Sequence, residues 1–299
     1  MFHEIPNKKI TYRFDKSIKP CLYIDSGDYI LFNTLDAHNR TVNIEELWAD
    51  VPFPELDDTN GNPVTGLVYV KGAKPGNLLK VKILEILPDP VGILPVRSYM
   101  GIIRDVVNER TARVVKFSNG RLWINKDISI SARPMIGTIG IAPEGDGLTT
   151  MLLGSHGGNM DDNFITTGSE VYLPIYNKGA LLGIGDIHVA MGEGELTCGG
   201  ADISAHVLVK VEVVKEPTII KNPFVIKNNL IATHGYDMHY PEAAKMATEE
   251  MCKIIMSKLK ISRFEAIIMM GARGDLGLCQ ACGSDILPMV VRIAFPILW

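Results

Sequence analysis

The sequence lacks the features of membrane-spanning, secreted and nucleic-acid-binding proteins. Its apolar stretch at residues 289–299 is too short to cross a bilayer and contains Arg292 and Pro296. The opening residues 1–16 are too polar for a secretory signal. The formal net charge is −4, and no basic cluster is interleaved with aromatic residues. We therefore expect neither a nucleic acid nor a membrane as a partner.

Cysteine is scarce in this chain of 299 residues. The five cysteines, an odd number, are scattered without the spacing of a disulfide framework. This pattern predicts reduced thiols and a cytoplasmic protein. Cys279 and Cys282 form a Cys-x-x-Cys motif, but no second motif completes a four-thiolate zinc site. We therefore interpret the pair as structural.

Three common catalytic signatures are also missing from the sequence. It contains no Gly-x-Ser-x-Gly nucleophile elbow, no Gly-x-Gly-x-x-Gly dinucleotide loop and no Gly-x-x-x-x-Gly-Lys-Ser/Thr phosphate loop. These absences disfavour a serine hydrolase of the α/β type, a Rossmann dehydrogenase and a P-loop nucleotide hydrolase.

What is present indicates a globular protein made mainly of strands. Hydrophobic residues make up 46% of the chain and charged residues 21%, enough to bury a large core. Residues 205–214 alternate apolar and polar side chains, as a half-exposed strand does. Residues 241–259 carry apolar side chains at helical spacing, and we expect a second helix at 262–270 and strands near 276–279 and 290–297. We predict one α+β, mainly β domain: a β-rich sandwich-like core over residues 1–215 and a smaller α/β portion over residues 216–299.

The glycine-rich run at residues 137–195 holds the candidate site. Asp186 and His188 lie two apart on an expected strand, so their side chains share a face. Asp36 and His38 repeat this Asp-x-His spacing, and Glu195 follows nearby. Carboxylate and imidazole groups suit divalent ions. We predict that Asp36, His38, Asp186, His188 and Glu195 bind a divalent metal, Zn²⁺ with Ca²⁺ as the alternative.

Other polar residues of the run are candidates for catalysis. His156 and Asn159 flank two glycines, whose backbone amides can approach a substrate oxygen. Asn159 and Asp161 could instead cap their own turn. Glu144 ends an apolar strand beside glycine, a position that suits either a general base or a solvated turn.

Five segments together resemble the acetamidase/formamidase family. They are YVKGAKPGNLLKVKI (69–83), GTIGIAPEGDG (137–147), HGGNMD (156–161), YLPIYNKGALLGIGDIHVAMGEGE (172–195) and GDLGLCQ (274–280). The resemblance implies hydrolysis of a non-peptide C–N bond in a small linear amide, a metal-containing site, a β-rich fold and a homodimer or higher homo-oligomer. The chain departs from the family at Met191 and in CQACGSD (279–285), where relatives often read CQ-x-V-Asp/Asn-Pro.

These residues lead to a mechanistic hypothesis. A bound metal activates water, Glu144 takes its proton and passes it to the leaving nitrogen, and His156 and Asn159 orient the amide. Glu193 is the next candidate base. Three alternatives stay open: a lactam or imide hydrolase, a non-enzymatic metal-stabilised binding protein, and an amidase with a cysteine nucleophile (Cys21, Cys198 or Cys279).

Overall fold

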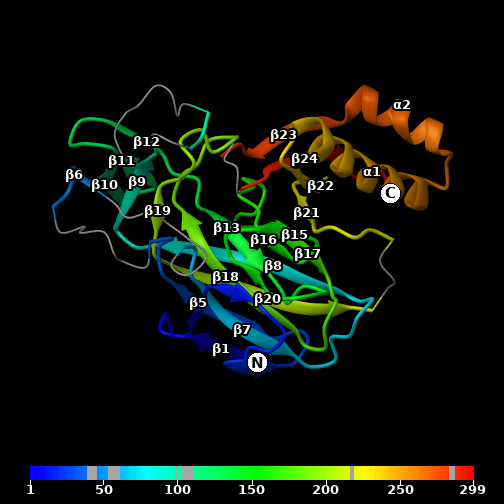
Figure 1. The fold of residues 1–299 in the computed structure, drawn as a ribbon, viewed down its shortest axis with the longest axis horizontal. Helices are drawn as coiled ribbons and strands as arrows, with labels where there is room; N and C mark the ends of the chain where they lie inside the picture. The colour runs from blue at the N-terminus through cyan, green and yellow to red at the C-terminus, as the bar shows by residue number, and fades with distance from the viewer. Residues whose placement is uncertain (39–45, 53–60, 98–99, 103–110, 216–218, 283–286) are drawn as a thin grey trace.

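The computed structural model describes residues 1–38, 46–52, 61–97, 100–102, 111–215, 219–282 and 287–299. The described residues form a mainly β protein with two helices, as the sequence predicts (Figure 1). The predicted Glu144, Asp36 and all other candidate site residues fall within these ranges.

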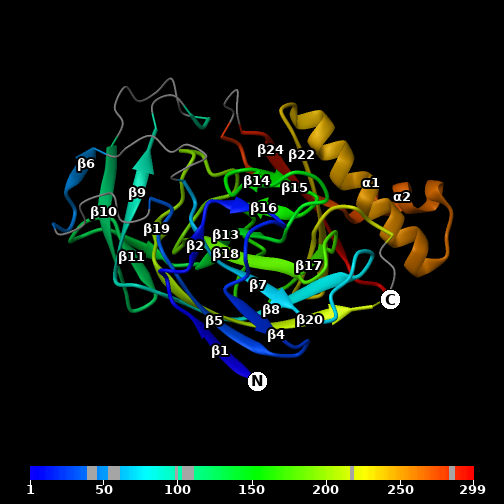
Figure 2. The same cartoon turned by 60° about the horizontal axis from the view of Figure 1, so that its bottom comes forward.

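Two large sheets build the protein. The first has nine strands, which run in the order β1 (Phe2–Ile5), β5 (Tyr29–Thr34), β20 (Ala205–Val214), β8 (Leu78–Pro88), β17 (Glu170–Pro174), β21 (Phe224–Lys227), β22 (Leu230–Asp237), β24 (Met289–Pro296) and β23 (Asp275–Gln280). Strands from both ends of the chain therefore belong to one sheet (Figure 2).

The second sheet has thirteen strands. Its main path is β12 (Ser129–Ser131), β11 (Arg121–Trp123), β10 (Thr111–Ser118), β9 (Val91–Val96), β19 (Asp202–Ile203), β18 (Ala180–His188), β13 (Met135–Gly140), β16 (Gly157–Asn159) and β15 (Leu153–Gly154). Off this path lie β2 (Ile10–Thr11), β4 (Leu22–Ile24), β6 (Asp50–Pro52) and β7 (Val64–Val70), and a separate pair is formed by β3 (Arg13–Phe14) and β14 (Leu148–Thr149). The main hydrophobic core draws side chains from both large sheets, for example Phe32 and Leu79 from the first and Ile136 and Leu182 from the second.

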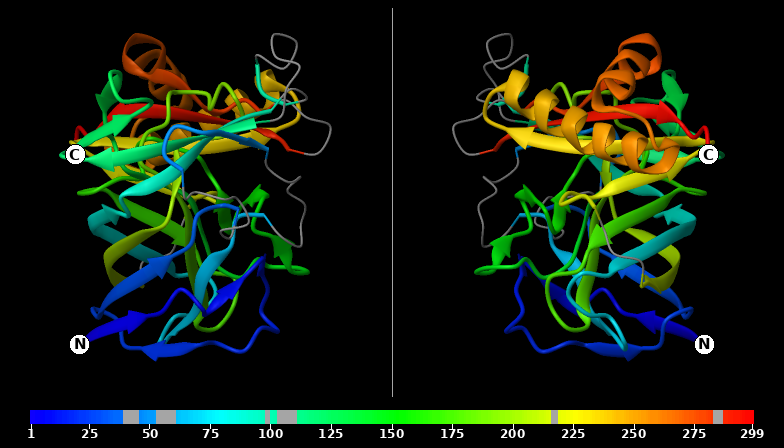
Figure 3. Two further views of the ribbon diagram at one scale, coloured as in Figure 1. Left: turned by 90° about the vertical axis from the view of Figure 1, so that its left-hand side faces the viewer. Right: turned by 90° about the vertical axis from the view of Figure 1, so that its right-hand side faces the viewer.

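The two helices pack on the strands near the C-terminus (Figures 1 and 3). Helix α1 (Tyr240–Leu259) buries Ala247, Met251 and Ile255 in a second core that includes Phe295 of β24. Helix α2 (Arg263–Arg273) begins after Ser262, whose side chain accepts the backbone N–H of Glu265 while the Glu265 carboxylate accepts the N–H of Ser262. Both helices lie within a few residues of their predicted positions. No helix within the described residues combines the length and apolar character needed to cross a membrane.

Strand β18 positions the candidate site. All nine of its residues are buried, and it runs between β13 and β7. In its pairing with β13, Gly185 lies opposite Thr138 and Ile187 lies opposite Ile136. Asp186, between them, has no partner in this ladder. Asp186 has φ of +53°, a left-handed conformation. The Asp186 carboxylate lies beside the His188 ring, with Oδ1 3.2 Å from Nε2.

Candidate metal centre

Asp161, Asp186 and His188 form a compact buried group. One ligand atom from each lies within 4.8 Å of the others, and all three side chains are buried. His188 Nε2 lies 3.2 Å from Asp186 Oδ1, and His188 Nδ1 lies 3.9 Å from Asp161 Oδ1. The expected pairing of Asp186 with His188 therefore exists, and Asp161 joins it.

A glycine makes room for the two carboxylates. A Cβ at Gly137 would stand 2.7 Å from Asp161 Oδ1 and 2.7 Å from Asp186 Oδ2, closer than real contacts allow. The backbone oxygen of Gly137 also accepts the N–H groups of Met160 and Asp161. Strand β13 thus holds the Asp161 turn against β18.

Each carboxylate of the group accepts hydrogen bonds from neighbouring side chains. Asn62 Nδ2 donates to Asp186 Oδ2 at 3.0 Å and to Asn159 Oδ1 at 2.8 Å. Thr138 Oγ lies 2.7 Å from Asn159 Oδ1 and 3.2 Å from Asp186 Oδ2. Gln280 Nε2 donates to Asp161 Oδ2 at 2.8 Å. Asn159, a predicted catalytic residue, therefore lies within the hydrogen-bond network of Asp186.

Asp202 links the two histidines that the sequence singled out. Its Oδ1 lies 3.2 Å from His188 Nε2, and its Oδ2 lies 3.2 Å from His38 Nε2. Burial alone would raise the pKa of Asp202, but hydrogen bonds from His188 and His38 hold it below its ordinary value. His38 therefore reaches the site through Asp202. Asp36 accepts the backbone N–H of His38 at 3.0 Å, and neither residue belongs to the described groups whose ligand atoms cluster.

The donor atoms fit a divalent cation. Asp161 Oδ1 and His188 Nδ1 are buried and have no hydrogen-bond partner among the described residues. A tetrahedral zinc ion holds two ligands, each at about 2.1 Å, roughly 3.4 Å apart, so the 3.9 Å separation would contract by about 0.5 Å around a bound ion. The Asp202 carboxylate, 3.2 Å from His188 Nε2, would fix the ring with Nδ1 toward the ion, as carboxylate–histidine pairs do in zinc sites. Although burial lowers the pKa of His188, Asp186 and Asp202 raise it well above 6.5, so a cation would replace this proton.

The charge of Glu195 interacts with the charges of the group. Burial, with the nearby Asp186 charge, raises its pKa to about 7. Burial and the charge of Glu195 likewise raise the pKa of Asp161. A carboxyl group poised near neutrality suits proton transfer.

The other two predicted catalytic residues lie in different surroundings. Glu144 is exposed on the turn after β13. His156 is fully buried against Phe14, with ring centroids 5.3 Å apart, and burial lowers its pKa to about 4. Neither His156 nitrogen has a hydrogen-bond partner among the described residues. His156 is therefore neutral at pH 7.

The cysteine expectation requires a correction. Cys198 and Cys282 form a disulfide, with Cα atoms 4.8 Å apart, so the thiols are not all reduced. Cys279 does not pair with Cys282 and is free and buried. No local pattern indicates this bridge, because the partners lie 84 residues apart. The Sγ atom of Cys282 lies 3.3 Å from Glu195 Oε2, so the bridge borders the site.

Sequence reasoning missed several members of the site. Asp161 stood in the glycine-rich run, where its spacing from Asn159 could have suggested a ligand as well as a cap. Asp202, Gln280, Asn62 and Thr138 had no local signal, because each reaches the site only through strand pairing or a distant loop.

The fold and the site define a β-rich protein with a buried acidic and histidine centre. The sequence model of the Acetamidase/Formamidase family matches residues 3–153 and 145–270. The chain belongs to this family. The match ends at residue 270, before Gln280.

Individual relatives agree with this assignment. The formamidase of Methylophilus methylotrophus is 39% identical over 72 residues, which are 24% of this chain and 18% of that protein. The aligned part thus spans less than a fifth of that relative. A predicted acetamidase/formamidase from Thermoanaerobacter tengcongensis has a TM-score of 0.91 at 30% identity, over 99% of this chain and 96% of its own. An acetamidase from Bacillus halodurans has a TM-score of 0.90 at 29% identity, covering 98% and 97%.

Proposed function

We propose that the chain is a metal-dependent amidase that hydrolyses small linear amides of the formamide or acetamide type to a carboxylate and ammonia. Family membership supports the reaction class. The observation that carries metal dependence is the buried pair of Asp161 Oδ1 and His188 Nδ1, which lack partners in the described structure and lie 3.9 Å apart.

We assign the metal ligands to Asp161, Asp186 and His188. A bound divalent ion would supply an acidified water and polarise the amide carbonyl. Asp202 holds the His188 ring, and Gln280 and Asn62 hold the two carboxylates. Asp36, His38 and a direct ligand role for Glu195 stay predictions.

We assign proton transfer to Glu195. An amide nitrogen is a poor leaving group unless it is protonated, so one residue must take a proton from water and return it to nitrogen. Glu195 is buried, and in the metal-free chain burial raises its pKa to about 7, which supports this role. Asn159 orients the substrate through its amide group, since its Oδ1 already accepts from Asn62 and Thr138. Glu144 and His156 stay predicted participants.

The cysteine alternative is disfavoured by thiol chemistry. The nucleophile in such enzymes is the thiolate, but burial raises the pKa of both Cys21 and Cys279, and Cys198 is in a disulfide. Iodoacetamide should leave turnover intact.

The test is ammonia release from formamide and acetamide by the zinc-loaded and the chelator-treated chain, with ring opening of 2-pyrrolidinone measured in parallel. We expect zinc-dependent turnover of a linear amide. Preferential turnover of the lactam would show that the chain hydrolyses cyclic amides instead. A chain that binds zinc but hydrolyses none of the substrates would be a metal-stabilised binding protein. Elemental analysis identifies the bound ion, and light scattering measures the expected homo-oligomer.

A further inference from the structure

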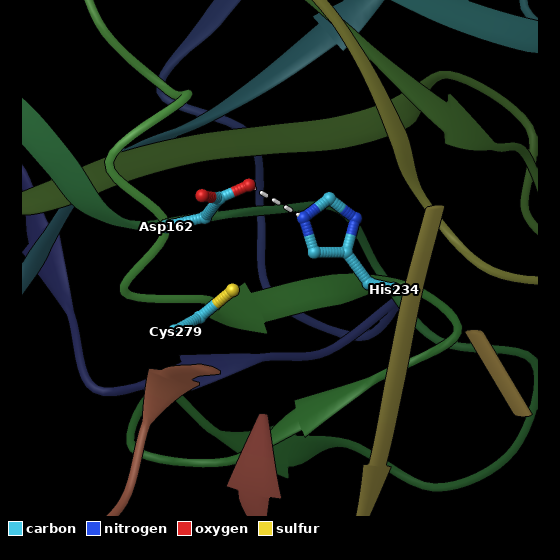
Figure 4. A group of neighbouring side chains, drawn as sticks. All are labelled: Asp162, His234 and Cys279. Carbon is cyan, nitrogen blue, oxygen red and sulfur yellow. Dashed lines mark hydrogen bonds and ion pairs between the residues drawn. The ribbon is translucent and has the colours of Figure 1, made fainter. Parts of the chain in front are cut away.

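A second buried cluster includes Asp162, the residue after Asp161. Asp162, His234 and Cys279 bring one ligand-type atom each within 4.8 Å of the others (Figure 4). Asp162 and His234 point toward each other, and His234 Nε2 lies 2.7 Å from Asp162 Oδ2. His234 Nδ1 lies 3.2 Å from the backbone oxygen of Pro223. Both ring nitrogens thus have partners.

This cluster already contains a cation, which argues against a second metal. Arg292 Nη1 donates to Asp162 Oδ1 at 2.9 Å and lies 3.6 Å from Cys279 Sγ. The guanidinium packs 4.3 Å from the ring centre of Phe164. A Cβ at Gly277 would stand 2.8 Å from its Cζ, so the glycine gives it room. A metal ion would have to displace a buried, fixed positive charge.

Arg292 also reaches a third segment. Its Nη2 donates to Glu193 Oε1 at 2.8 Å. The guanidinium therefore joins Asp162 and Glu193, which are 31 positions apart in the chain, and it does so from β24. Because the guanidinium is planar and rigid, its two bonded nitrogens fix the two carboxylates relative to each other.

Each segment that Arg292 contacts carries a site residue close by in sequence. Asp162 follows Asp161, and Cys279 precedes Gln280, the hydrogen-bond donor to Asp161. Glu193 precedes Glu195 by two positions, and Gly194 between them bridges to Gln280 as an isolated strand pair. The segments of Asp162 and Cys279 thus each place one side chain at the metal centre and another on Arg292. The segment of Glu193 carries Glu195, whose charge acts on Asp161.

We infer that Arg292 is a positioning residue that sets the spacing of Asp161 and Glu195 through its contacts with Asp162, Cys279 and Glu193. This inference rests on the proposed function, because it assigns Asp161 to the metal and Glu195 to proton transfer. A purely structural arginine would affect stability alone. A positioning arginine also sets the geometry around a bound ion and the rate of the chemical step.

The experiment compares wild type with Arg292→Lys, Arg292→Ala and Glu193→Gln. Glu193 is half exposed, so its variant severs one arm of the contact with little risk to folding. Arg113→Ala, which removes an exposed pair with Asp50, is the matched control. The readouts are kcat and KM for the better linear amide, and the visible absorption spectrum of the Co²⁺-loaded chain.

We expect kcat to fall by about 10- to 100-fold in Arg292→Lys with KM changed less than about threefold, the range found for partners that orient metal ligands. Glu193→Gln should lower kcat in the same direction. The Co²⁺ spectrum should shift in the Arg292 variants and not in Arg113→Ala. Methylguanidinium should restore part of the kcat of Arg292→Ala.

Wild-type kcat and an unchanged Co²⁺ spectrum in both Arg292→Lys and Glu193→Gln would overturn the inference. So would a loss of activity that follows only the unfolded fraction and that methylguanidinium does not restore. Failure of the proposed function gives a different result: a wild type that binds Co²⁺ but hydrolyses no amide, in which the spectral comparison still decides the role of Arg292. A wild type that neither binds Co²⁺ nor turns over an amide would end both proposals.

Discussion

Asp161 and Asp162 are neighbours in the chain, yet their carboxylates lie in two different buried clusters. Asp161 faces His188 and Gln280, whereas Asp162 pairs with His234 and Arg292. Asp161 has φ of +45°, a left-handed conformation that lets consecutive side chains diverge in this way. The two clusters are therefore joined by a single peptide bond.

Replacing His188 with alanine should remove both the bound zinc and the turnover, because it deletes the imidazole that Asp202 orients. We expect zinc affinity to fall by more than about 100-fold, beyond the effect of losing an orienting partner. Elemental analysis after gel filtration measures this loss. His206→Ala, at a half-exposed histidine on β20, is the control. A His188→Ala chain with full zinc content would remove His188 from the ligand set.

Glu195→Gln and Glu144→Gln separate the two candidate bases. Glu195→Gln should keep zinc and lose roughly 100-fold or more in kcat, because an amide cannot exchange the proton. Glu144→Gln should leave kcat within about twofold, because Glu144 is exposed on a turn. The reverse ranking in steady-state ammonia release would return the base role to Glu144.

The pKa of Glu195 predicts how the metal-free chain responds to pH. Burial first, and the Asp186 charge next among the raising effects, lift it from 4.5 to about 7. Above pH 4.5 the unfolded chain therefore ionises this group more readily than the folded chain does. The unfolding free energy should fall as pH rises from about 4.5 to 7, by up to about 3 kcal/mol from this group.

Urea unfolding of chelator-treated protein at pH 5 and pH 8 measures this effect. Glu195→Gln should lose less stability between the two values than wild type does. Equal losses in both proteins would mean that Glu195 ionises at its ordinary pKa.

Gly137→Ala should weaken metal binding. The added methyl group would collide with Asp161 Oδ1 and Asp186 Oδ2, each 2.7 Å away, and strain of this kind costs about 1–3 kcal/mol. Gly145→Ala is the matched control, since no atom lies within 4 Å of its Cβ position. Thermal melting and zinc titration should distinguish the two variants, and equal zinc affinities would show that the carboxylates tolerate the methyl group.

The Cys198–Cys282 disulfide can be tested by counting the free thiols of the chain. Thiol titration of the unreduced, unfolded chain should find three free thiols, Cys21, Cys252 and Cys279. Reduction should lower the unfolding free energy by roughly 2–4 kcal/mol, because the bridge closes a long loop. Cys282→Val should melt like the reduced chain, with Cys21→Ser as the control. Five free thiols at the outset would refute the bridge.

The features that depend on neighbouring residues in the chain could be predicted from the sequence. Helix α1 was found from the spacing of Ala247, Met251 and Ile255, which do pack on the strands below. The pairing of Asp186 with His188 was found because both lie on one strand, although the strand is distorted at Asp186.

The remaining contacts depend on which strands become neighbours. Asp202 meets His188 because β19 pairs with β18, and their register places the two residues opposite each other. Gln280 meets Asp161 across 119 positions of the chain. The pattern of residues within one segment does not predict a contact between distant segments. The hydrogen bonds that orient the site residues, and the disulfide, could therefore not be predicted from local patterns.

The place of β24 between β22 and β23 affects the order of events during synthesis. The ribosome completes both neighbours before it makes the strand that joins them. Gln280, on β23, therefore lacks its pairing with Val290 until β24 has left the exit tunnel. A ribosome-bound chain stalled before β24 emerges should not capture Co²⁺, and the same chain should do so after release. Equal capture in both states would show that the centre assembles without β24.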